Sequence, residues 1–319
     1  MLEKEPILSI IVPIYNHEKY IRQCINGILM QEVNFEYEVL IGEDCSTDKS
    51  ANILVEIEEE LPSNFQIFYR EKNMGMGRGG NASDLAKRAK GKYIITLEGD
   101  DYWTYKYKLR EQVEFLENHT EYVAVAHNCL MVDENGKPLN TRYAECCEEE
   151  YRWEHFLQWL LPGQLATIVL RKSFYVELKK FYEKYKKYES FQGDRLKSFL
   201  LLSMGQVYCI QQQWSAYRFV TTSGTSFSAR YVWNEERMKQ RGLFLESIYE
   251  YALDKGNKEA ILTVGKMLYK NRIWHCFGKE KIYSLMWVLR ELGKEKNRFT
   301  YINYIFQFSL KKLITTCSK

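Results

Sequence analysis

Three carboxylates stand together at residues 98–101, where the chain reads Glu-Gly-Asp-Asp after a short apolar run. Glu98, Asp100 and Asp101 would repel one another as anions unless a cation offsets their charge. Hard divalent cations prefer carboxylate oxygens, and a diphosphate could complete the coordination of such an ion. The sequence therefore predicts a Mn²⁺ or Mg²⁺ site held by Asp100, with Asp101 as the competing ligand. The alternative is a solvated acidic turn.

Another polar cluster, Val-Pro-Ile-Tyr-Asn at residues 12–16, ends the first apolar run of the chain. An aromatic ring just beyond a strand end, as at Tyr15, can stack on a nucleotide base. A plain turn explains the same residues equally well.

Asp44 follows a second apolar run and can accept a hydrogen bond from the polar edge of a base. Ser46 or Thr47 can instead cap a helix that follows. The glycine-rich residues 73–81 would let the backbone approach a ligand closely, and Arg78 in that loop could meet a phosphate. The loop matches neither GxGxxG nor the P-loop pattern, so by itself it is weak evidence.

Alternating strand and helix patterns would have to position these side chains. Predicted strands cover residues 7–13, 37–41, 66–69, 92–97 and 122–126, with amphipathic helices between them. This alternation predicts an α/β fold whose central sheet is mostly parallel and flanked by helices. Ligands bind beyond the carboxyl ends of the strands in such sheets, which is where the polar clusters fall.

Later segments give weaker patterns. Asp133-Glu134-Asn135-Gly136 predicts a hairpin turn. Residues 173–188 and 194–204 predict helices, residues 167–170, 207–210 and 214–219 predict strands, and the pattern after about residue 228 is helical.

The order of these motifs resembles glycosyltransferase family 2, whose members have the GT-A fold. Members show a VPxYN strand end, a DDGSTD turn, an NxG…RN loop and a DxD motif. The corresponding segments here are Val-Pro-Ile-Tyr-Asn at 12–16, Glu-Asp-Cys-Ser-Thr-Asp at 43–48, Asn-Met-Gly at 73–75 with Asn81, and Leu-Glu-Gly-Asp-Asp-Tyr-Trp at 97–103. The resemblance covers roughly residues 7–220. It implies an inverting, metal-dependent transfer of a sugar from a UDP- or dTDP-sugar, in the synthesis of a cell-surface polysaccharide.

The resemblance also implies a donor site. Tyr15 would lie against the base, Asp44 at its polar edge, Glu98 near the ribose and Asp100 on the metal. The full set of implied donor-binding residues is Pro13, Tyr15, Asn16, Asp44, Asn73, Arg78, Glu98, Asp100 and Arg218. Arg218 would either reach the diphosphate or serve the structure.

Asp194, in the sequence Gly-Asp-Arg at the start of a predicted helix, takes the place of the family's catalytic base. A base in this reaction removes the proton of the acceptor hydroxyl as its oxygen attacks the anomeric carbon. An N-cap aspartate is the alternative role.

The chain departs from the family pattern in several places. Glu98 replaces the commoner Asp, Cys45 the usual Gly, and Glu43 the usual first Asp. Gly80 stands where the loop arginine would precede Asn81, so Arg78 or Arg88 would have to substitute for it.

Two other functions remain open at this point. A nucleotidyltransferase on a similar sheet would be expected to have a basic, glycine-rich loop after the first strand, which residues 13–16 lack. A non-catalytic module would bind the nucleotide sugar without needing both Asp100 and Asp194.

Length and patterning predict a GT-A domain at residues 1–225 and a helical extension at 226–319. The domain would have a nucleotide-sugar half at 1–103 and an acceptor half at 104–225. The net charge of +3 argues against a dedicated nucleic-acid binder. Eight cysteines without metal spacing, and no apparent signal peptide, favour a cytoplasmic location.

The tail from residue 266 to residue 319 has 12 Lys and Arg against 3 Asp and Glu. One helical stripe there contains Ile302, Ile305, Phe306, Leu310, Leu313 and Ile314. Such a helix could lie on the inner face of the cell membrane, near a lipid-linked or other glycan acceptor. It could equally pack on the catalytic domain or form a homodimer.

Overall fold

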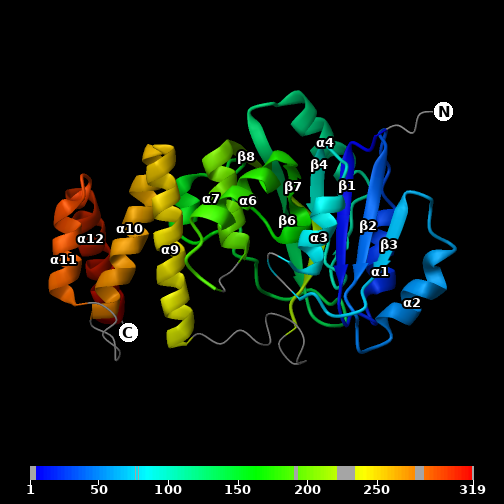
Figure 1. The fold of residues 1–319 in the computed structure, drawn as a ribbon, viewed down its shortest axis with the longest axis horizontal. Coiled ribbons are helices and arrows are strands. Elements are labelled where there is room, and N and C mark those ends of the chain that lie inside the picture. Colours follow the sequence, from blue (N-terminus) through cyan, green and yellow to red (C-terminus); the bar gives the residue numbers. More distant parts are fainter. Residues whose placement is uncertain are drawn as a thin grey trace. The chain divides into compact units, whose positions relative to one another are not determined.

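The computed structural model describes residues 5–75, 77, 79–189, 193–220, 234–276 and 284–317, with side chains as far as residue 309. The chain forms two compact units, coloured along the sequence in Figure 1. The first consists of Met1–Arg152, Trp159–Leu178 and Gly193–Val232, and the second of Trp153–Gln158, Lys179–Gln192 and Trp233–Lys319. Two short segments that precede residue 225 therefore belong with the C-terminal helices.

Within the described residues, the first unit is built on an eight-stranded sheet in the order β3-β2-β1-β4-β7-β6-β8-β5. The strands are β1 (Leu8–Ile14), β2 (Tyr37–Glu43), β3 (Phe65–Tyr69), β4 (Tyr93–Thr96), β5 (Tyr102–Trp103), β6 (Tyr122–Val132), β7 (Val169–Arg171) and β8 (Gln206–Arg218). The helices that connect them are α1 (Ile21–Leu29), α2 (Ser50–Glu58), α3 (Asn81–Arg88), α4 (Lys108–Asn118), the short 3₁₀ helix η1 (Leu165–Thr167) and α7 (Gly193–Met204). Helix α6 (Ser173–Lys184) begins in the first unit and ends in the second.

The sheet is mixed. Parallel pairs join β3 to β2, β2 to β1, β1 to β4 and β6 to β8, whereas β7 runs antiparallel to β4 and β6, and β5 antiparallel to β8. The predicted α/β class with flanking helices is confirmed. Because β2 and β4 lie on opposite sides of β1, the carboxyl ends of β1 and β4 form a topological switch point, where ligands bind in sheets of this kind.

Alternation along β1 explains why helices cover both faces of the sheet. Leu8, Ile10, Val12 and Ile14 share one fully buried core with α1, α2 and α4. Intervening residues of β1 point to the other face, where α3 packs on β1 and β2. The strands are therefore apolar on both sides, as a buried parallel sheet requires.

Two predicted strands at 207–210 and 214–219 are in fact the single strand β8, so that prediction is wrong. The register against β6 shifts between His127 and Asn128, where Ile210 is followed by Gln213 as the next paired residue. The bulge at this point breaks the two-residue period that the sequence pattern relied on. The predicted hairpin after β6 is confirmed, with Gly136 at a φ of +82° and Asp133 N–H donating to Lys137 O over 2.9 Å.

The second unit contains α5 (Trp153–Leu157), α9 (Glu235–Lys255), α10 (Lys258–Cys276), α11 (Leu285–Lys294) and α12 (Arg298–Cys317). Tyr301 is fully buried and stacks on Tyr269, with 5.5 Å between the ring centroids. Lys184 and Lys187 form ion pairs with Asp254 and Glu250 of α9. In the part of the chain that the structure describes, no helix combines the length and apolarity needed to cross a membrane.

Candidate active site

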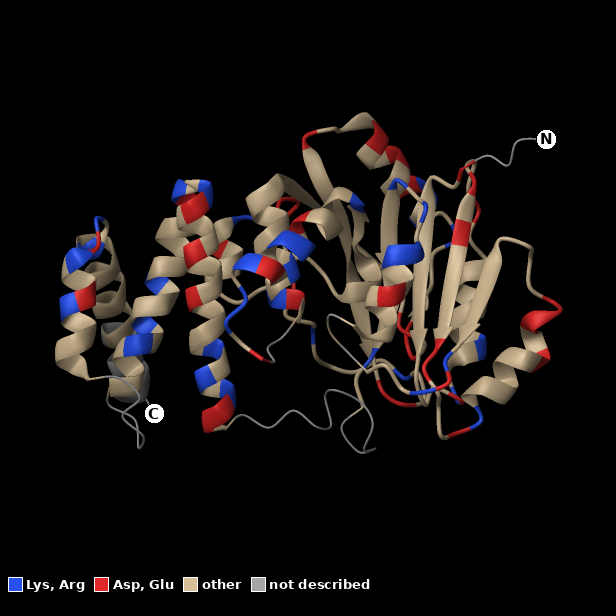
Figure 2. Ribbon diagram, in the orientation of Figure 1, with Lys and Arg blue, Asp and Glu red and all other residues tan. Residues whose placement is uncertain are grey.

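The ends of β1 and β4 are joined by a backbone hydrogen bond from Gly99 N–H to Pro13 O over 3.2 Å. A β-carbon at Gly99 would stand 2.7 Å from His17 Nδ1 and 3.0 Å from Ile14 Cγ1. Glycine is thus needed for the turn after β4 to lie against His17. Acidic residues gather in loops at this carboxyl edge of the strands (Figure 2).

Asp101 points into the protein and is 1% exposed. One carboxylate oxygen accepts from Gln164 Nε2 over 2.9 Å, and the other accepts from the backbone N–H of Arg218 over 2.8 Å. Burial, followed by the charges of Asp100 and Glu98, raises the pKa of Asp101 well above its usual range. The geometry of Asp101 is that of a buried anchor for the acidic turn.

The guanidinium of Arg218 is buried and its donors are engaged by the protein. Nε donates to Asp100 O over 2.9 Å, and Nη2 donates to Gln23 Oε1 over 2.8 Å. Nη1 donates to the carbonyl oxygens of Asp133 and Glu134 in the hairpin after β6. The side chain also lies over the Tyr20 ring, 4.2 Å from its centroid. Arg218 thus ties the acidic turn to α1 and to the hairpin.

Asp100, in contrast, stays accessible. Its side chain is 24% exposed, and within the described residues its carboxylate accepts no hydrogen bond. His17 Nε2 lies 3.8 Å from Asp100 Oδ2, which is too long for a hydrogen bond. His17 Nδ1 is buried without a hydrogen-bond partner. Sequence reasoning missed His17, whose only signal was its place one residue beyond the Val-Pro-Ile-Tyr-Asn motif.

Glu98, Asp194 and Lys197 form an electrostatic group beside Asp100. Burial raises the pKa of Glu98 to about 8, and the charges of Asp100 and then Asp194 add to the shift. Burial lowers the pKa of Lys197, while Asp194 and Glu98 oppose that shift. Asp194 lies in the first turn of α7, as predicted, and Lys197 follows it by one helical turn. That spacing could have identified Lys197 from the sequence.

Asp44 is 4% exposed at the end of β2. Its two carboxylate oxygens accept from the backbone N–H groups of Met74 and Gly75, over 2.7 and 3.1 Å. The side-chain amide of Asn73 donates to Asp44 O over 3.0 Å. Asp44 therefore holds the start of the glycine-rich loop against the carboxyl end of β2. Arg78 lies outside the described residues.

Asn16 connects the turn after β1 to the turn after β2. Its Oδ1 accepts from the backbone N–H of Thr47 over 2.8 Å, and its own N–H donates to Ser46 Oγ over 3.0 Å. Helix α2 begins at Ser50, and the backbone N–H of Ser50 donates to Asp48 Oδ1. The alternative that Ser46 or Thr47 caps this helix is therefore wrong, because the N-cap residue is Lys49. Tyr15, next to Asn16, is 37% exposed.

The departures from the family pattern have structural consequences. Cys45 adopts a φ of +56°, the left-handed region that favours glycine. Glu43 accepts from the N–H groups of Cys45 and Ser46 and so braces this turn. Arg70 donates to Asn81 Oδ1 over 3.3 Å and to Asp84 Oδ2 over 2.8 Å. An arginine does lie against Asn81, but it comes from the end of β3, which the loop pattern could not indicate.

Comparison with known proteins agrees with this geometry. The family model described as "Glycosyl transferase family 2" matches residues 9–181, more than half of the chain. An uncharacterized protein of Mycobacterium tuberculosis is 36% identical over 129 residues, which cover 40% of this chain and 37% of that protein. The putative teichuronic acid biosynthesis glycosyltransferase TuaG of Bacillus subtilis is 32% identical over 140 residues, which cover 44% of this chain and 53% of TuaG.

TarS of Staphylococcus aureus, a poly(ribitol-phosphate) β-N-acetylglucosaminyltransferase, is 34% identical over 112 residues, covering 35% of this chain and 19% of TarS. The matches thus span about half or less of the length of these curated relatives. The crystal structure of TarS residues 1–349 with UDP-GlcNAc superposes with a TM-score of 0.62 at 20% identity, covering 93% of this chain and 79% of that one.

That superposition confirms the GT-A-like fold. The family match confirms the resemblance read from the four ordered motifs, and the chain belongs to glycosyltransferase family 2.

Proposed function

We propose that this protein transfers a sugar, with inversion, from a nucleoside-diphosphate sugar to an acceptor hydroxyl. The observation that carries the proposal is the meeting of three elements at the carboxyl edge of the sheet. Asp100 follows β4, Tyr15 and His17 follow β1, and Asp194 on α7 lies close enough for its charge to raise the pKa of Glu98. Family membership supports the reaction class.

Asp194 would serve as the base. Its carboxylate would take the proton of the acceptor hydroxyl while that oxygen forms a bond to the anomeric carbon. The bond from the anomeric carbon to the diphosphate oxygen breaks, and its electron pair leaves with the nucleoside diphosphate. Lys197, one turn along α7, lies near enough to Asp194 and Glu98 for their charges to oppose the lowering of its pKa by burial.

A divalent cation fits Asp100 better than Asp101. Asp100 has a carboxylate free of protein hydrogen bonds, with the imidazole of His17 facing it, whereas both oxygens of Asp101 are engaged. In the described part of the chain no three His, Cys, Asp or Glu side chains converge to hold an ion by themselves. Asp100 would therefore hold Mn²⁺ or Mg²⁺ together with diphosphate oxygens. The bound cation would supply charge stabilisation for the departing diphosphate.

In the donor site Tyr15 would stack on the base and Glu98 would lie near the ribose. Asp44 would accept from the base edge through a second lone pair of its carboxylate, whose oxygens already accept from Met74 and Gly75. Pro13, Asn16, Asn73 and Arg78 would shape or line the same site. We assign Arg218 a positioning role, since the described protein groups engage its donors. TarS holds UDP-GlcNAc, and TarS and TuaG are named for cell-wall glycans. A UDP-sugar donor and a cell-surface glycan acceptor are thus the first candidates, followed by a dTDP-sugar.

Hydrolysis of a panel of UDP- and dTDP-sugars without acceptor, with and without Mn²⁺, tests the proposal. Asp100→Ala should abolish metal-dependent nucleotide binding measured by calorimetry. Asp194→Asn should keep donor affinity and lower turnover by about 10²- to 10⁴-fold. A matched carboxylate far from the site, Glu121→Gln, should change neither property. Metal-dependent binding that survives in Asp100→Ala, or turnover of Asp194→Asn within tenfold of wild type, would contradict these assignments.

We further propose that the catalytic region ends near residue 225 and that the helical extension contacts the inner face of the cell membrane. Phe299, Ile302 and Phe306 on α12 are 73%, 47% and 62% exposed, and Met286 on α11 is 79% exposed. Leu310, Leu313 and Ile314 continue the predicted stripe beyond the described side chains. Exposed apolar rings beside basic residues suit an anionic lipid surface.

Co-sedimentation with anionic and neutral vesicles tests this contact. Anionic vesicles should retain the protein at low salt and release it as ionic strength rises, because salt screens the attraction. Phe306→Ser should weaken the retention. Absent binding to anionic vesicles at low salt, or equal binding to neutral ones, would contradict an electrostatic membrane contact. A dimer whose formation depends on Phe306 would make a second copy of the chain the occupant of this face.

A further inference from the structure

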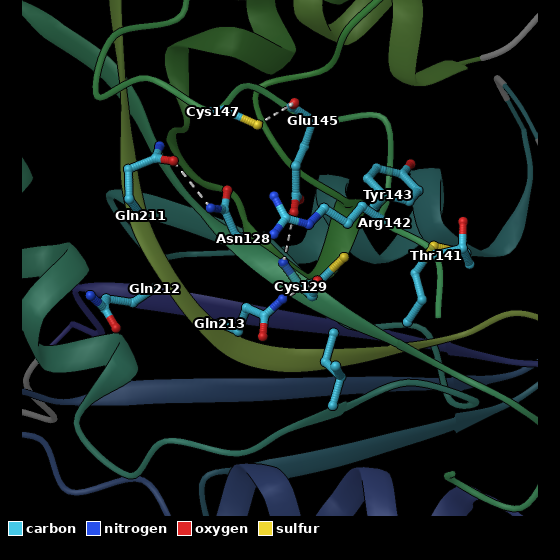
Figure 3. A pocket seen from close by; sticks show the side chains of 12 residues that line it. Asn128, Cys129, Thr141, Arg142, Tyr143, Glu145, Cys147, Gln211, Gln212 and Gln213 are labelled. Atoms are coloured by element: carbon cyan, nitrogen blue, oxygen red, sulfur yellow. Dashed lines mark hydrogen bonds between the residues drawn. The ribbon is translucent and has the colours of Figure 1, made fainter. Parts of the chain in front are cut away.

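A second polar site lies away from the acidic turn, over the middle of β6 and β8. The pocket there is lined by Asn128, Cys129, Leu130 and Met131 of β6, by Thr141, Arg142, Tyr143, Glu145 and Cys147 of the following loop, and by Gln211, Gln212 and Gln213 of β8. Figure 3 shows the Glu145 side chain reaching toward Cys129 and the amide of Asn128 directed toward Gln211 within it. None of these residues belongs to a family motif described above.

Two buried oxygen atoms in this pocket lack hydrogen-bond partners. Glu145 is 8% exposed, and its Oε1 accepts from Cys129 N–H over 3.2 Å while its Oε2 has no partner. Asn128 donates through Nδ2 to Gln211 Oε1 over 3.2 Å while its Oδ1 has no partner. An unpartnered buried polar atom is destabilising, so such a pair calls for an explanation such as a ligand that completes it.

The strand geometry also exposes polar groups here. Gln211 and Gln212 lie in the bulge of β8, between the residues that pair with His127 and Asn128. Bulges next to binding sites re-aim side chains that a regular strand would point elsewhere. Gln211 Nε2 is occupied by Glu148 O and Cys209 O, while Gln212 is exposed at the rim.

Arg142 and Glu145 are the charged residues of the pocket lining, and the charge of Arg142 opposes the effect of burial on Glu145. Burial raises the pKa of Glu145 to about 8, so its carboxyl group is mostly protonated near neutral pH. Because Oε1 accepts from Cys129 N–H, the proton belongs on Oε2, where it can be donated to a ligand. Asn128 Oδ1 is an acceptor nearby. A hydroxyl group, which both donates and accepts, satisfies this combination.

Tyr143 connects the pocket to the predicted base. It lines the pocket, and its ring lies 5.3 Å from that of Tyr217, measured between centroids. Burial raises the pKa of Tyr143, and the charge of Asp194 is the next contribution. Tyr143 thus borders the pocket and also lies within electrostatic range of Asp194.

We propose that this pocket binds a hydroxyl-rich segment of the acceptor, a saccharide or alditol unit, through Asn128 Oδ1 and Glu145 Oε2. The inference rests on the proposed transferase function and names the substrate class of its second substrate. The bound unit would adjoin the one whose hydroxyl reaches Asp194, and so the pocket would select the acceptor rather than take part in the chemistry.

Saturation-transfer NMR tests the proposal on the full chain, with UDP and Mn²⁺ present to fill the nucleotide site. The probes are neutral methyl glycosides and linear alditols, with inorganic phosphate as an anionic competitor. Asn128→Ala and Glu145→Leu should each weaken the best probe by about three- to tenfold, as expected for one lost hydrogen bond. Glu145→Gln keeps the Cys129 contact and presents a donor in place of Oε2, so it should bind the probe within about twofold of wild type.

Asn118→Ala, on the exposed end of α4, is the matched control and should leave probe affinity unchanged. The inference is overturned if no probe shows saturation transfer, if Asn128→Ala and Glu145→Leu bind as tightly as Asn118→Ala, or if phosphate displaces every probe. UDP binding is measured by calorimetry in the same samples. If the wild-type protein does not bind UDP, the proposed function fails. Intact UDP binding without glycoside or alditol binding marks failure of this inference alone.

Discussion

The acidic turn after β4 and the pocket over β6 and β8 use polar side chains in opposite ways. Around the turn, Asp44 is tied to the glycine-rich segment, Asn16 to Thr47, and Arg218 to the hairpin, whereas His17 Nδ1 has no partner. In the pocket, Asn128 and Glu145 each keep one buried oxygen atom without a partner.

This difference separates two tasks. A nucleoside diphosphate is common to many enzymes of the family. The loops proposed to bind it must hold one conformation, which their mutual hydrogen bonds stabilise. An acceptor differs from enzyme to enzyme, and the groups that recognise it are left unsatisfied until it binds. Unsatisfied polar groups lower stability, so a protein retains them where a ligand completes their hydrogen bonds.

Replacing Arg218 should produce the largest loss of stability. Arg218→Met removes the donors to Asp100 O, Asp133 O and Glu134 O and leaves those acceptors partly buried without them. We expect a loss of about 2–4 kcal/mol in the free energy of unfolding, because several hydrogen bonds from one charged donor are lost together. Urea unfolding followed by tryptophan fluorescence measures it.

Arg152→Met is the matched control, because Arg152 is 55% exposed and pairs with Glu148 and Glu150 at the surface. Its loss should stay below about 1 kcal/mol. Equal effects of the two substitutions would show that Arg218 does not brace the turn.

Two asparagines test the comparison directly. Asn16→Ala removes the acceptor for Thr47 N–H and places alanine at a φ of +58°, which alanine tolerates poorly. We therefore expect the free energy of unfolding to fall by about 1–2 kcal/mol. Asn128→Ala removes one weak hydrogen bond together with an unpartnered oxygen atom, so the change should stay within about 0.5 kcal/mol. Thermal and urea unfolding of both variants decide the matter, and a larger loss for Asn128→Ala would contradict the division drawn here.

The sequence predicted the strands of the first 100 residues well because these elements obey simple periods. The strands around residues 8–14, 37–43 and 93–96 are apolar on both faces, and their carboxyl ends carry the predicted Tyr15, Asp44 and Asp100. The sequence could not predict which polar groups form hydrogen bonds with neighbouring residues of the protein. Asp100 and Asp101 are adjacent and chemically identical, yet only the fold turns Asp101 toward Gln164 and Arg218.

The acceptor half was harder for a related reason. Its pocket depends on a bulge in β8 at Gln211 and Gln212, and the same bulge made one strand look like two. Glu145 lies in a loop without periodic pattern, and its burial results from contact with β6, 16 residues earlier in the sequence at Cys129. Long-range contacts of this kind leave no local signal.

The smallest expected effect concerns Cys45, the position where this chain departs from the family's glycine. Its φ of +56° costs an L-residue about 1–2 kcal/mol, and its Sγ makes only a weak contact with Glu71 O at 3.7 Å. Cys45→Gly should therefore raise the free energy of unfolding by about 0.5–1 kcal/mol, despite the greater freedom of glycine in the unfolded chain.

Cys147→Gly is the matched control in the acceptor pocket, since Cys147 is also exposed but does not have a positive φ. There the same substitution brings only the entropic penalty, about 0.4–1 kcal/mol of lost stability. Urea unfolding under reducing conditions distinguishes the two signs. A loss of stability in both variants would mean that the turn after β2 does not store backbone strain at Cys45, and that its hydrogen bonds to Glu43 are satisfied without cost.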